Sequence, residues 1–348
     1  METNKIGFLL SKEFEELPYY ELYSLLDKNN KIEKVINNFV VVSNINTNKG
    51  VEIINRGGYI NECYNLLFKV NNLNELYDKL NNYCFSEYDN NKNNSNNKNN
   101  NFAVRVLKIV DSSIKSMDIE KHIGGIIKNK TNLSVNLKAP NTTFKVIILN
   151  NEIYFSVLLN SRDREYYLKN RPHLRAYFHP GCILPKLARC MVNISKVNKG
   201  DILFDPFCGT GGFLIEGGLI GCKLVGSDID INMVNGSKLN LESYNLNKNI
   251  ISIKQYNALK CREYLNELNI DFVDGIVTDP PYGISTTKKG DIEYILNNLK
   301  SCLKENGYLV FASPTKLKLD DLILEKLYPI YVHKSLTRYI HVFKNSKR

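Results

Sequence analysis

The segment DPPYG at residues 279–283 places an acid, two prolines, an aromatic ring and a glycine directly after the apolar run DGIVT. Asp279 offers a carboxylate and Pro280 a backbone carbonyl. Because proline fixes φ, both oxygen acceptors belong to a stiff loop. Tyr282 offers a flat face on which a planar ring can stack, a contact worth about 1–3 kcal/mol for a nucleic-acid base. These residue types are suited to holding an amino group attached to a planar ring.

An exocyclic amino group of a nucleobase is a poor nucleophile, because its lone pair is delocalised into the ring. Two acceptors aimed at its two N–H groups turn the lone pair toward an incoming methyl carbon, and holding both in place beforehand lowers the barrier. The segment therefore indicates methyl transfer to such a nitrogen, with Asp279, Pro280 and Tyr282 as the catalytic residues. Asp-Pro and Pro-Pro are also common turn dipeptides, so this interpretation needs support from elsewhere in the chain.

Residues 201–217, DILFDPFCGTGGFLIEG, have the pattern of a strand, a glycine-rich turn and a helix. Glycines such as Gly209 and Gly211 let the backbone approach a ligand closely, and the start of a helix offers free amide donors. The dinucleotide fingerprint GxGxxG is absent from this turn, which argues against a nicotinamide dehydrogenase. Asp205 at the strand end would repel a phosphate. The segment thus favours a cationic cofactor without phosphate groups.

Two further polar residues follow the next two predicted strands. Asp228 comes nineteen positions after Gly209, the distance at which nucleotide-binding folds place a ribose-binding acid. Asp228 could instead cap the next helix, but Asp230 is the better capping candidate. With Asp205 facing an ammonium, Asp228 accepting two ribose hydroxyls and Asn257 accepting from an adenine amino group, the set matches S-adenosyl-L-methionine. The other predicted cofactor-binding residues are Pro206, Phe207, Gly209, Gly211, Ile229 and Ala258.

A regular alternation of strands and helices positions these residues. Apolar strands DILFDPF, KLVGSDI, IISIKQYN, DGIVTDPP and GYLVFAS alternate with helices predicted around 212–220, 231–245, 260–268 and 291–304. Such strands predict a parallel sheet buried on both faces, a doubly wound α/β (Rossmann) domain that binds ligands beyond the carboxyl ends of its strands. The tail YPIYVHKSLTRYIHVFK predicts a closing antiparallel hairpin.

The N-terminal half shows a less regular pattern, which predicts small α+β units. The Asn-rich run at 89–101 predicts a disordered surface loop, and the Arg-rich, proline-punctuated stretch at 161–181 predicts a linker over the surface. The expected strands are 6–10, 51–55, 104–110, 144–150 and 152–160, and the expected helices are 14–29, 73–84 and 119–130.

The composition narrows the class of protein. The 348 residues suit two or three domains, and 46 Lys and Arg against 36 Asp and Glu give a net charge of +10, compatible with a polyanionic partner. Eight singly scattered cysteines predict free thiols in a reducing cytosol, with neither a metal site nor a disulfide framework. No run approaches the roughly 18 apolar residues of a membrane helix. We expect a cytoplasmic protein without a membrane anchor.

Taken together, the motifs resemble those of S-adenosylmethionine-dependent amino-methyltransferases with the motif (D/N/S)PP(Y/F), in which aspartate favours a nucleobase over a glutamine amide. The stretches FAVRVLKI, IEKHIGGIIKN, VNLKAPNTTFKVIIL and IYFSVLL resemble a THUMP domain, an RNA-binding module of tRNA-modifying enzymes, in the expected order. The stretches RPHLRAYFHPGCILPKLARCMVNIS and HKSLTRYIHVF, with DPFCGTGGFLIEG and TDPPYG, resemble the archaeal and eukaryotic tRNA guanine-10 N2-methyltransferases. Asn257 departs from the aspartate frequent in these relatives, which weakens only the adenine assignment.

This resemblance implies that the chain is divided into four parts. They are a ferredoxin-like subdomain at 1–55, a THUMP domain at 56–160 interrupted by the Asn-rich insert, a linker at 161–180 and a Rossmann-fold methyltransferase domain at 181–348. It also implies methylation of N2 of guanosine 10 in tRNA, once or twice, on a base that is flipped into the DPPY pocket. A eukaryotic-type enzyme would need a small activating protein, and otherwise a monomer is expected.

Several alternatives stay open at this stage. The substrate could be another tRNA guanosine, such as position 6, or DNA adenine, or the chain could be an RNA-binding protein with an inactive methyltransferase domain. The proton released from the amine could pass to Asp279 or to water. Phe207 could replace Tyr282 as the stacking ring, or it could simply pack in the core.

Overall fold

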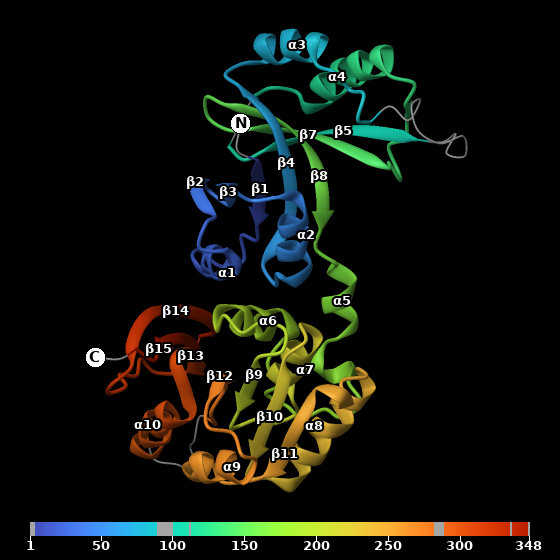
Figure 1. Ribbon diagram of the computed structural model, residues 1–348. Helices are drawn as coiled ribbons and strands as arrows, with labels where there is room; N and C mark the ends of the chain where they lie inside the picture. Colours follow the sequence, from blue (N-terminus) through green and yellow to red (C-terminus); the bar gives the residue numbers. More distant parts are fainter. Residues whose placement is uncertain (1–3, 89–99, 111–112, 282–288, 335, 347–348) are drawn as a thin grey trace. The chain divides into compact units, whose positions relative to one another are not determined.

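The computed structural model describes residues 4–88, 100–110, 113–281, 289–334 and 336–346, with only the backbone described at 289–291 and 333. It divides into two compact units (Figure 1). The first consists of Met1–Lys12, Leu26–Asn55 and Ile60–Arg162, and the second of Glu13–Leu25, Arg56–Tyr59 and Asp163–Arg348. The second unit is therefore assembled from three separate stretches of chain.

The first unit contains an eight-stranded sheet with the order β2-β3-β1-β4-β8-β7-β5-β6. Its strands are β1 (Lys5–Leu10), β2 (Lys31–Ile36), β3 (Phe39–Ser43), β4 (Ile60–Val70), β5 (Asn101–Lys108), β6 (Ser134–Val135), β7 (Thr142–Ile148) and β8 (Ile153–Ser161). The helices described in this part of the chain are α2 (Thr47–Arg56), α3 (Leu73–Asn82) and α4 (Ser116–Lys130). Ile119, Ile123 and Ile127 of α4, spaced four apart, pack with Phe144 and Phe155 of the sheet.

Most elements predicted in this half are confirmed, and one is wrong. The predicted strand at 51–55 lies in α2, whose buried Gly50, Ile53 and Ile54 follow helical spacing. A short apolar run does not by itself distinguish a strand from a buried helix turn, which explains the error. Most of the Asn-rich run predicted as a loop, residues 89–99, lies outside the described residues, and β5 begins at its end.

The second unit contains a seven-stranded sheet with the order β11-β10-β9-β12-β13-β15-β14. Its strands are β9 (Ile202–Asp205), β10 (Lys223–Asp228), β11 (Ile250–Gln255), β12 (Val273–Thr278), β13 (Leu303–Ser313), β14 (Ile323–His333) and β15 (Leu336–Lys344). Strands β9 to β13 pair in parallel, whereas β15 pairs antiparallel with both β13 and β14. The predicted parallel sheet and its closing hairpin are confirmed.

Helices cover both faces of this sheet. They are α1 (Leu17–Leu25), α5 (Arg164–Lys169), α6 (Pro185–Ile194), α7 (Gly212–Leu219), α8 (Ile231–Ser243), α9 (Cys261–Glu267) and α10 (Lys289–Asn298), with short 3₁₀ turns η1 (Pro172–Leu174), η2 (Asn247–Asn249), η3 (Ala258–Lys260) and η4 (Leu299–Cys302). Neighbouring strand residues point to opposite faces, so Leu203 packs with the core under α6 and α7, and Phe204 with the core under α9 and α10. The helix predicted at 291–304 ends earlier, because β13 begins at Leu303.

The helix predicted at 14–29 is shorter and belongs to the second unit. Leu17 and Tyr20 of α1 join the same core as α6 and α7, and the Tyr20 hydroxyl donates to Glu325 at 2.9 Å. No described helix is long and apolar enough to cross a membrane.

Candidate active site

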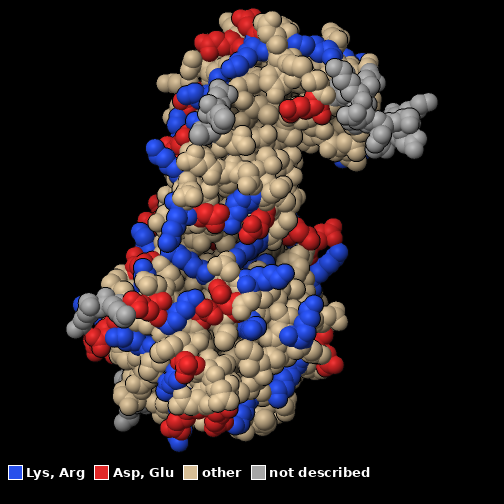
Figure 2. Space-filling model, viewed as in Figure 1, with Lys and Arg blue, Asp and Glu red and all other residues tan. Residues whose placement is uncertain are grey.

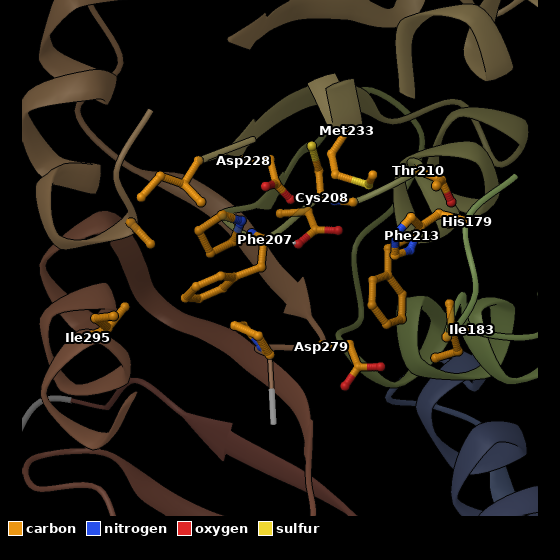
Figure 3. A pocket seen from close by; sticks show the side chains of 18 of the residues that line it. His179, Ile183, Phe207, Cys208, Thr210, Phe213, Asp228, Met233, Asp279 and Ile295 are labelled. Atoms are coloured by element: carbon orange, nitrogen blue, oxygen red, sulfur yellow. Dashed lines mark hydrogen bonds between the residues drawn. The ribbon is translucent and has the colours of Figure 1, made fainter. Parts of the chain in front are cut away.

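The carboxyl ends of the parallel strands surround a cavity of about 940 Å³ in the second unit. The turns after β9, β10, β11 and β12 all contribute to its wall, as expected for a doubly wound sheet. In the view of Figure 3, Asp228 lies above Phe207, and Asp279 lies below it and to the right. The predicted site residues that line the cavity are Asp205, Pro206, Phe207, Gly209, Asp228, Ile229, Asn257, Ala258 and Asp279.

The glycine-rich turn between β9 and α7 depends on glycine at one position. Gly211 has φ +83°, and a Cβ atom there would lie 2.6 Å from Ser237 Oγ. Gly211 is the N-cap of α7 and has no side chain to occupy the first amide donors of the helix. The turn therefore brings backbone N–H groups close to the cavity, where they can bind an anionic or polar part of a ligand.

Asp228 ties the end of β10 to this turn. Its Oδ2 accepts from the Gly209 N–H at 2.9 Å, and its Oδ1 accepts from the Asp230 N–H at 3.0 Å. A carboxylate has about four acceptor positions, so two remain for hydroxyl groups of a ligand. Asp230 caps α8 by accepting from the Asn232 N–H at 2.8 Å, which confirms the predicted capping residue.

Asp205 is the most enclosed of the carboxyl groups in the cavity wall, with 1% of its surface exposed. It accepts from Thr278 Oγ1 at 2.7 Å and from the Phe207 N–H at 3.2 Å. Burial raises the pKa of Asp205 to about 8, and the nearby carboxyl groups of Asp228 and Asp279 act in the same direction. A cationic ligand in the cavity would favour its ionised form.

Asn257 lies two residues beyond the end of β11 and lines the cavity, but its side-chain oxygen makes a local hydrogen bond. It accepts from the Leu259 N–H at 3.0 Å and so caps the turn η3. The neighbouring Ala258 and the 70% exposed Ile229 also line the cavity. Ile229 and Ala258 give this side of the cavity an apolar surface beside the polar Asn257, a composition suited to a flat ring system.

Asp279 follows β12 and lines the cavity, as does Pro281, whereas Pro280 is buried and is not one of the residues that line the cavity. The Asp279 Oδ2 atom lies 3.8 Å from Nη1 of Arg338 on β15, and both side chains are 17% exposed. Tyr282, the predicted stacking residue, lies outside the described residues. Phe207 both lines the cavity and packs against the core under α9, so the two alternatives raised for it are compatible.

Sequence reasoning missed part of the wall. His179, Cys182 and Ile183, from the region predicted as a surface linker and just beyond it, line the cavity, and Cys182 Sγ lies 3.1 Å from Thr210 Oγ1 of the glycine-rich turn. Arg175, in the same stretch, is only 9% exposed. Residues 175–183 are therefore part of the folded unit. The sequence feature that indicates a folded segment here is the mixture of prolines with apolar residues, which is unusual for a fully solvated linker.

No group of His, Cys, Asp and Glu residues suited to a metal ion occurs in the part of the chain that the structure describes.

A sheet with this topology and with polar residues at its carboxyl edge is the arrangement of a Rossmann-like, ligand-binding domain. The family model described as "RMKL-like, methyltransferase domain" matches residues 172–337, and the THUMP domain model matches residues 70–158. The crystal structure of TrmN from Thermus thermophilus has the same fold, with a TM-score of 0.56 and 16% identity over 98% of this chain and 99% of that chain.

The relatives give a narrower assignment. A tRNA (guanine(10)-N2)-dimethyltransferase from Methanocaldococcus jannaschii is 50% identical over 97% of this chain and 99% of its own length. The enzyme of the same name from Pyrococcus abyssi is 29% identical over 94% of this chain and 96% of its own length. The chain belongs to the tRNA (guanine(10)-N2)-dimethyltransferase family.

Proposed function

We propose that this protein transfers methyl groups from S-adenosylmethionine to N2 of guanosine 10 in tRNA. The observation that carries the proposal is the position of Asp279, whose carboxylate lines the same cavity as Asp205, Asp228 and the glycine-rich turn. The names of the relatives that align over nearly the whole chain support the choice of base and position.

The cavity fits S-adenosylmethionine in size and chemistry. Its volume of about 940 Å³ lies within the usual range of small-molecule sites. We assign Asp228 to the ribose hydroxyls, the region of Asp205 and the glycine-rich turn to the amino acid part, and the surroundings of Ile229, Asn257 and Ala258 to the adenine. The Asn257 oxygen already caps η3, so it offers at most its remaining acceptor position to the adenine amine. When bound, S-adenosylmethionine supplies a methyl carbon on a positively charged sulfur.

Asp279 and Pro280 orient the target amine in this proposal. The Asp279 carboxylate and the Pro280 carbonyl accept from the two N2–H groups, so the nitrogen lone pair points into the cavity. Nitrogen forms a bond to the methyl carbon while the carbon–sulfur bond breaks and its electron pair stays on sulfur. The nitrogen then carries a positive charge and loses a proton to Asp279 or to water. The neutral N2-methylated amine that results retains one N–H group.

That remaining N–H permits a second transfer. Rotation about the C2–N2 bond presents the hydrogen to the same acceptors with the first methyl group turned away. The full-length relatives are named dimethyltransferases, which supports two transfers. We also propose that the protein is a cytoplasmic monomer that needs no activating protein.

The first unit would hold the tRNA through its THUMP domain. Figure 2 shows Lys and Arg side chains spread over the visible face of both units and interspersed with Asp and Glu. A net charge of +10 favours binding to a polyanion, but it does not select a base. Base selection would therefore depend on the cavity.

Methyl transfer to defined tRNA transcripts tests this function. We expect label from S-adenosylmethionine to appear as N2-methylguanosine and N2,N2-dimethylguanosine at position 10. A matched transcript with inosine at position 10, which lacks only the amino group, should remain unlabelled. Label at guanosine 6, or equal label in the inosine transcript, would contradict the proposal.

A further inference from the structure

Arg338 is an unexpected neighbour of the proposed catalytic carboxylate. It belongs to the tail HKSLTRYIHVF, for which the proposed reaction assigns no role. Strand β15 runs antiparallel to β13, and the last pair between them is Ser313 with Tyr339. Arg338 precedes this pair, so it lies at the carboxyl edge of the parallel strands, where β12 ends at Thr278.

The contact between Arg338 and Asp279 is partly shielded from water. Arg338 Nη1 lies 3.8 Å from Asp279 Oδ2, and each side chain is 17% exposed. The guanidinium group is always charged and only donates hydrogen bonds, whereas an ionised carboxylate only accepts them. Asp279, which lines the cavity, therefore has a neighbouring side chain that can only donate hydrogen bonds.

The Watson–Crick edge of guanine requires this combination. It presents N2–H and N1–H as donors and then O6 as an acceptor. Adenine presents a donor at N6 beside an acceptor at N1, and cytosine presents a donor at N4 followed by two acceptors. Guanine is thus the standard base with two adjacent donors followed by an acceptor, and flipped bases are read through this edge.

We propose that Asp279 and Arg338 together recognise guanine in the pocket, which makes Arg338 a specificity-determining residue. Asp279 accepts from N2–H with Oδ1 and from N1–H with Oδ2, the oxygen that faces Arg338. The Arg338 guanidinium donates to O6. Pro280 accepts from the second N2–H, as proposed above. This inference rests on the proposed function, since it assumes that a guanine enters the cavity.

The pair also explains how adenine would be rejected. An adenine with N6 at the methyl-transfer position would place the lone pair of N1 against Asp279 Oδ2. Two acceptors would then face each other in a partly buried site, and no O6 would be present for Arg338. Sites built around buried polar partners reject such bases strongly, because the partners are left unpaired.

A base analogue at position 10 tests this assignment. 2-Aminopurine keeps the N2 amine but lacks O6 and the N1 proton. Under single-turnover conditions, we expect the wild-type protein to prefer guanine over 2-aminopurine. Replacing Arg338 with methionine (Arg338→Met) should reduce this preference roughly 10- to 100-fold, the range expected for loss of one good base contact. The change should appear mainly as a slower reaction with guanine.

Two further variants separate recognition from folding. Arg338→Lys keeps the charge beside Asp279 but loses the planar fork, so its preference should fall between those of wild type and Arg338→Met. Lys326→Met, which removes an exposed cation on the neighbouring strand β14, should leave the preference unchanged. Binding of S-adenosylhomocysteine by each variant verifies that the cavity is intact.

The outcomes distinguish this inference from the proposed function. If wild type does not methylate guanosine 10, the proposed function fails. If wild type is active and Arg338→Met slows both bases by the same factor, Arg338 has only a structural role and the inference is wrong. An unchanged preference in Arg338→Met with a normal guanine rate would also overturn it.

Discussion

Three carboxyl groups line one cavity, but their surroundings give them different properties. Asp228 accepts from two backbone N–H groups, which fixes its orientation. Asp205 is almost fully buried and hydrogen-bonded to Thr278, and burial raises its pKa to about 8. Asp279 lies beside the guanidinium group of Arg338. Asp279 is the carboxylate that we propose accepts from the target amine.

Replacing Asp279 with alanine should reduce methyl transfer by roughly 10²- to 10³-fold, as for the loss of one preorganised polar group in an active site. Binding of tRNA and of S-adenosylhomocysteine should be retained, since the cofactor is assigned to other residues. Single-turnover rates and equilibrium binding measure the two effects separately. Asp271→Ala, which removes an exposed acid shortly before β12, is the matched control and should behave like wild type. Near-normal turnover in Asp279→Ala would exclude the proposed role.

The buried Asp205 predicts a pH dependence of stability. Its pKa of about 8 in the folded protein lies above the ordinary value of 3.8. Between these values the folded protein keeps a proton that the unfolded chain releases. The stabilisation linked to this proton is therefore complete below about pH 4 and is lost as the pH rises toward 8.

Replacing Asp205 with asparagine should remove this dependence, because the amide oxygen can still accept from Thr278 but carries no titrating proton. As the pH rises from 5 to 8, the wild-type protein should lose free energy of unfolding relative to Asp205→Asn. The loss should be up to about 1.4 kcal/mol for each pH unit. Denaturant unfolding of both proteins at several pH values measures this difference. Parallel pH profiles would show that Asp205 ionises normally.

At the scale of single elements, the turn between β9 and α7 contributes Cys208, Gly209 and Thr210 to the wall of the cavity. Gly211 has a left-handed conformation that other residues adopt at a cost, and Ser237 of α8 leaves no room for a side chain. The same turn contains Gly209, whose N–H binds Asp228. A change of backbone at Gly211 would therefore alter both the amide donors and the orientation of Asp228, the acid that we propose binds the ribose.

Gly211→Ala should lower the free energy of unfolding by roughly 1–3 kcal/mol and weaken S-adenosylhomocysteine binding about 10-fold or more. The matched control is Gly125→Ala in the interior of α4, where no atom lies within 4 Å of the added carbon. That substitution should stabilise the protein by about 0.5–1 kcal/mol, because alanine favours a helix more than glycine. Denaturant unfolding and calorimetric titration give both quantities. Normal binding by Gly211→Ala would contradict the role assigned to the turn.

At the scale of the whole molecule, the second unit includes a helix from the start of the chain. Glu21 of α1 is fully buried and accepts from the Gly58 and Tyr59 N–H groups, both at 2.7 Å, and from Asn193 Nδ2 at 2.8 Å. Burial raises the pKa of Glu21, and the three hydrogen bonds oppose this effect. One carboxyl group thus joins three separate stretches of the chain. The methyltransferase domain therefore depends on residues well outside the range matched by its family model.

Glu21→Ala should lower the free energy of unfolding of the second unit by roughly 2–5 kcal/mol, because several buried donors would lose their acceptor. Glu15→Gln, in the exposed stretch before α1, should have little effect. Thermal unfolding of the full-length variants tests this, with S-adenosylhomocysteine added to identify the transition of the second unit. A transition temperature equal to that of wild type would show that α1 does not stabilise the domain.

Local pattern was enough to predict much of the fold and the site. The alternation of apolar strands and helices after residue 200 predicts the parallel sheet. Asp205, Asp228 and Asp279 each stand at the carboxyl end of a strand of that sheet, and they line one cavity. These inferences succeed because each residue follows its own strand, and carboxyl ends of parallel strands meet at one edge. The run at 51–55 has the apolar character of a strand but belongs to α2. Over five residues, apolar side chains do not show whether they repeat every two residues, as in a strand, or about every 3.6, as in a helix.

Only the tertiary structure shows the contacts between distant stretches of chain. It places Arg338 beside Asp279, α1 in the second unit, and His179 in the wall of the cavity. None of these contacts leaves a periodic signal, since each depends on how an antiparallel strand, an early helix or an irregular segment packs against the finished sheet. The chemistry at each strand end was thus determined by sequence, whereas the partners of those groups were determined by packing.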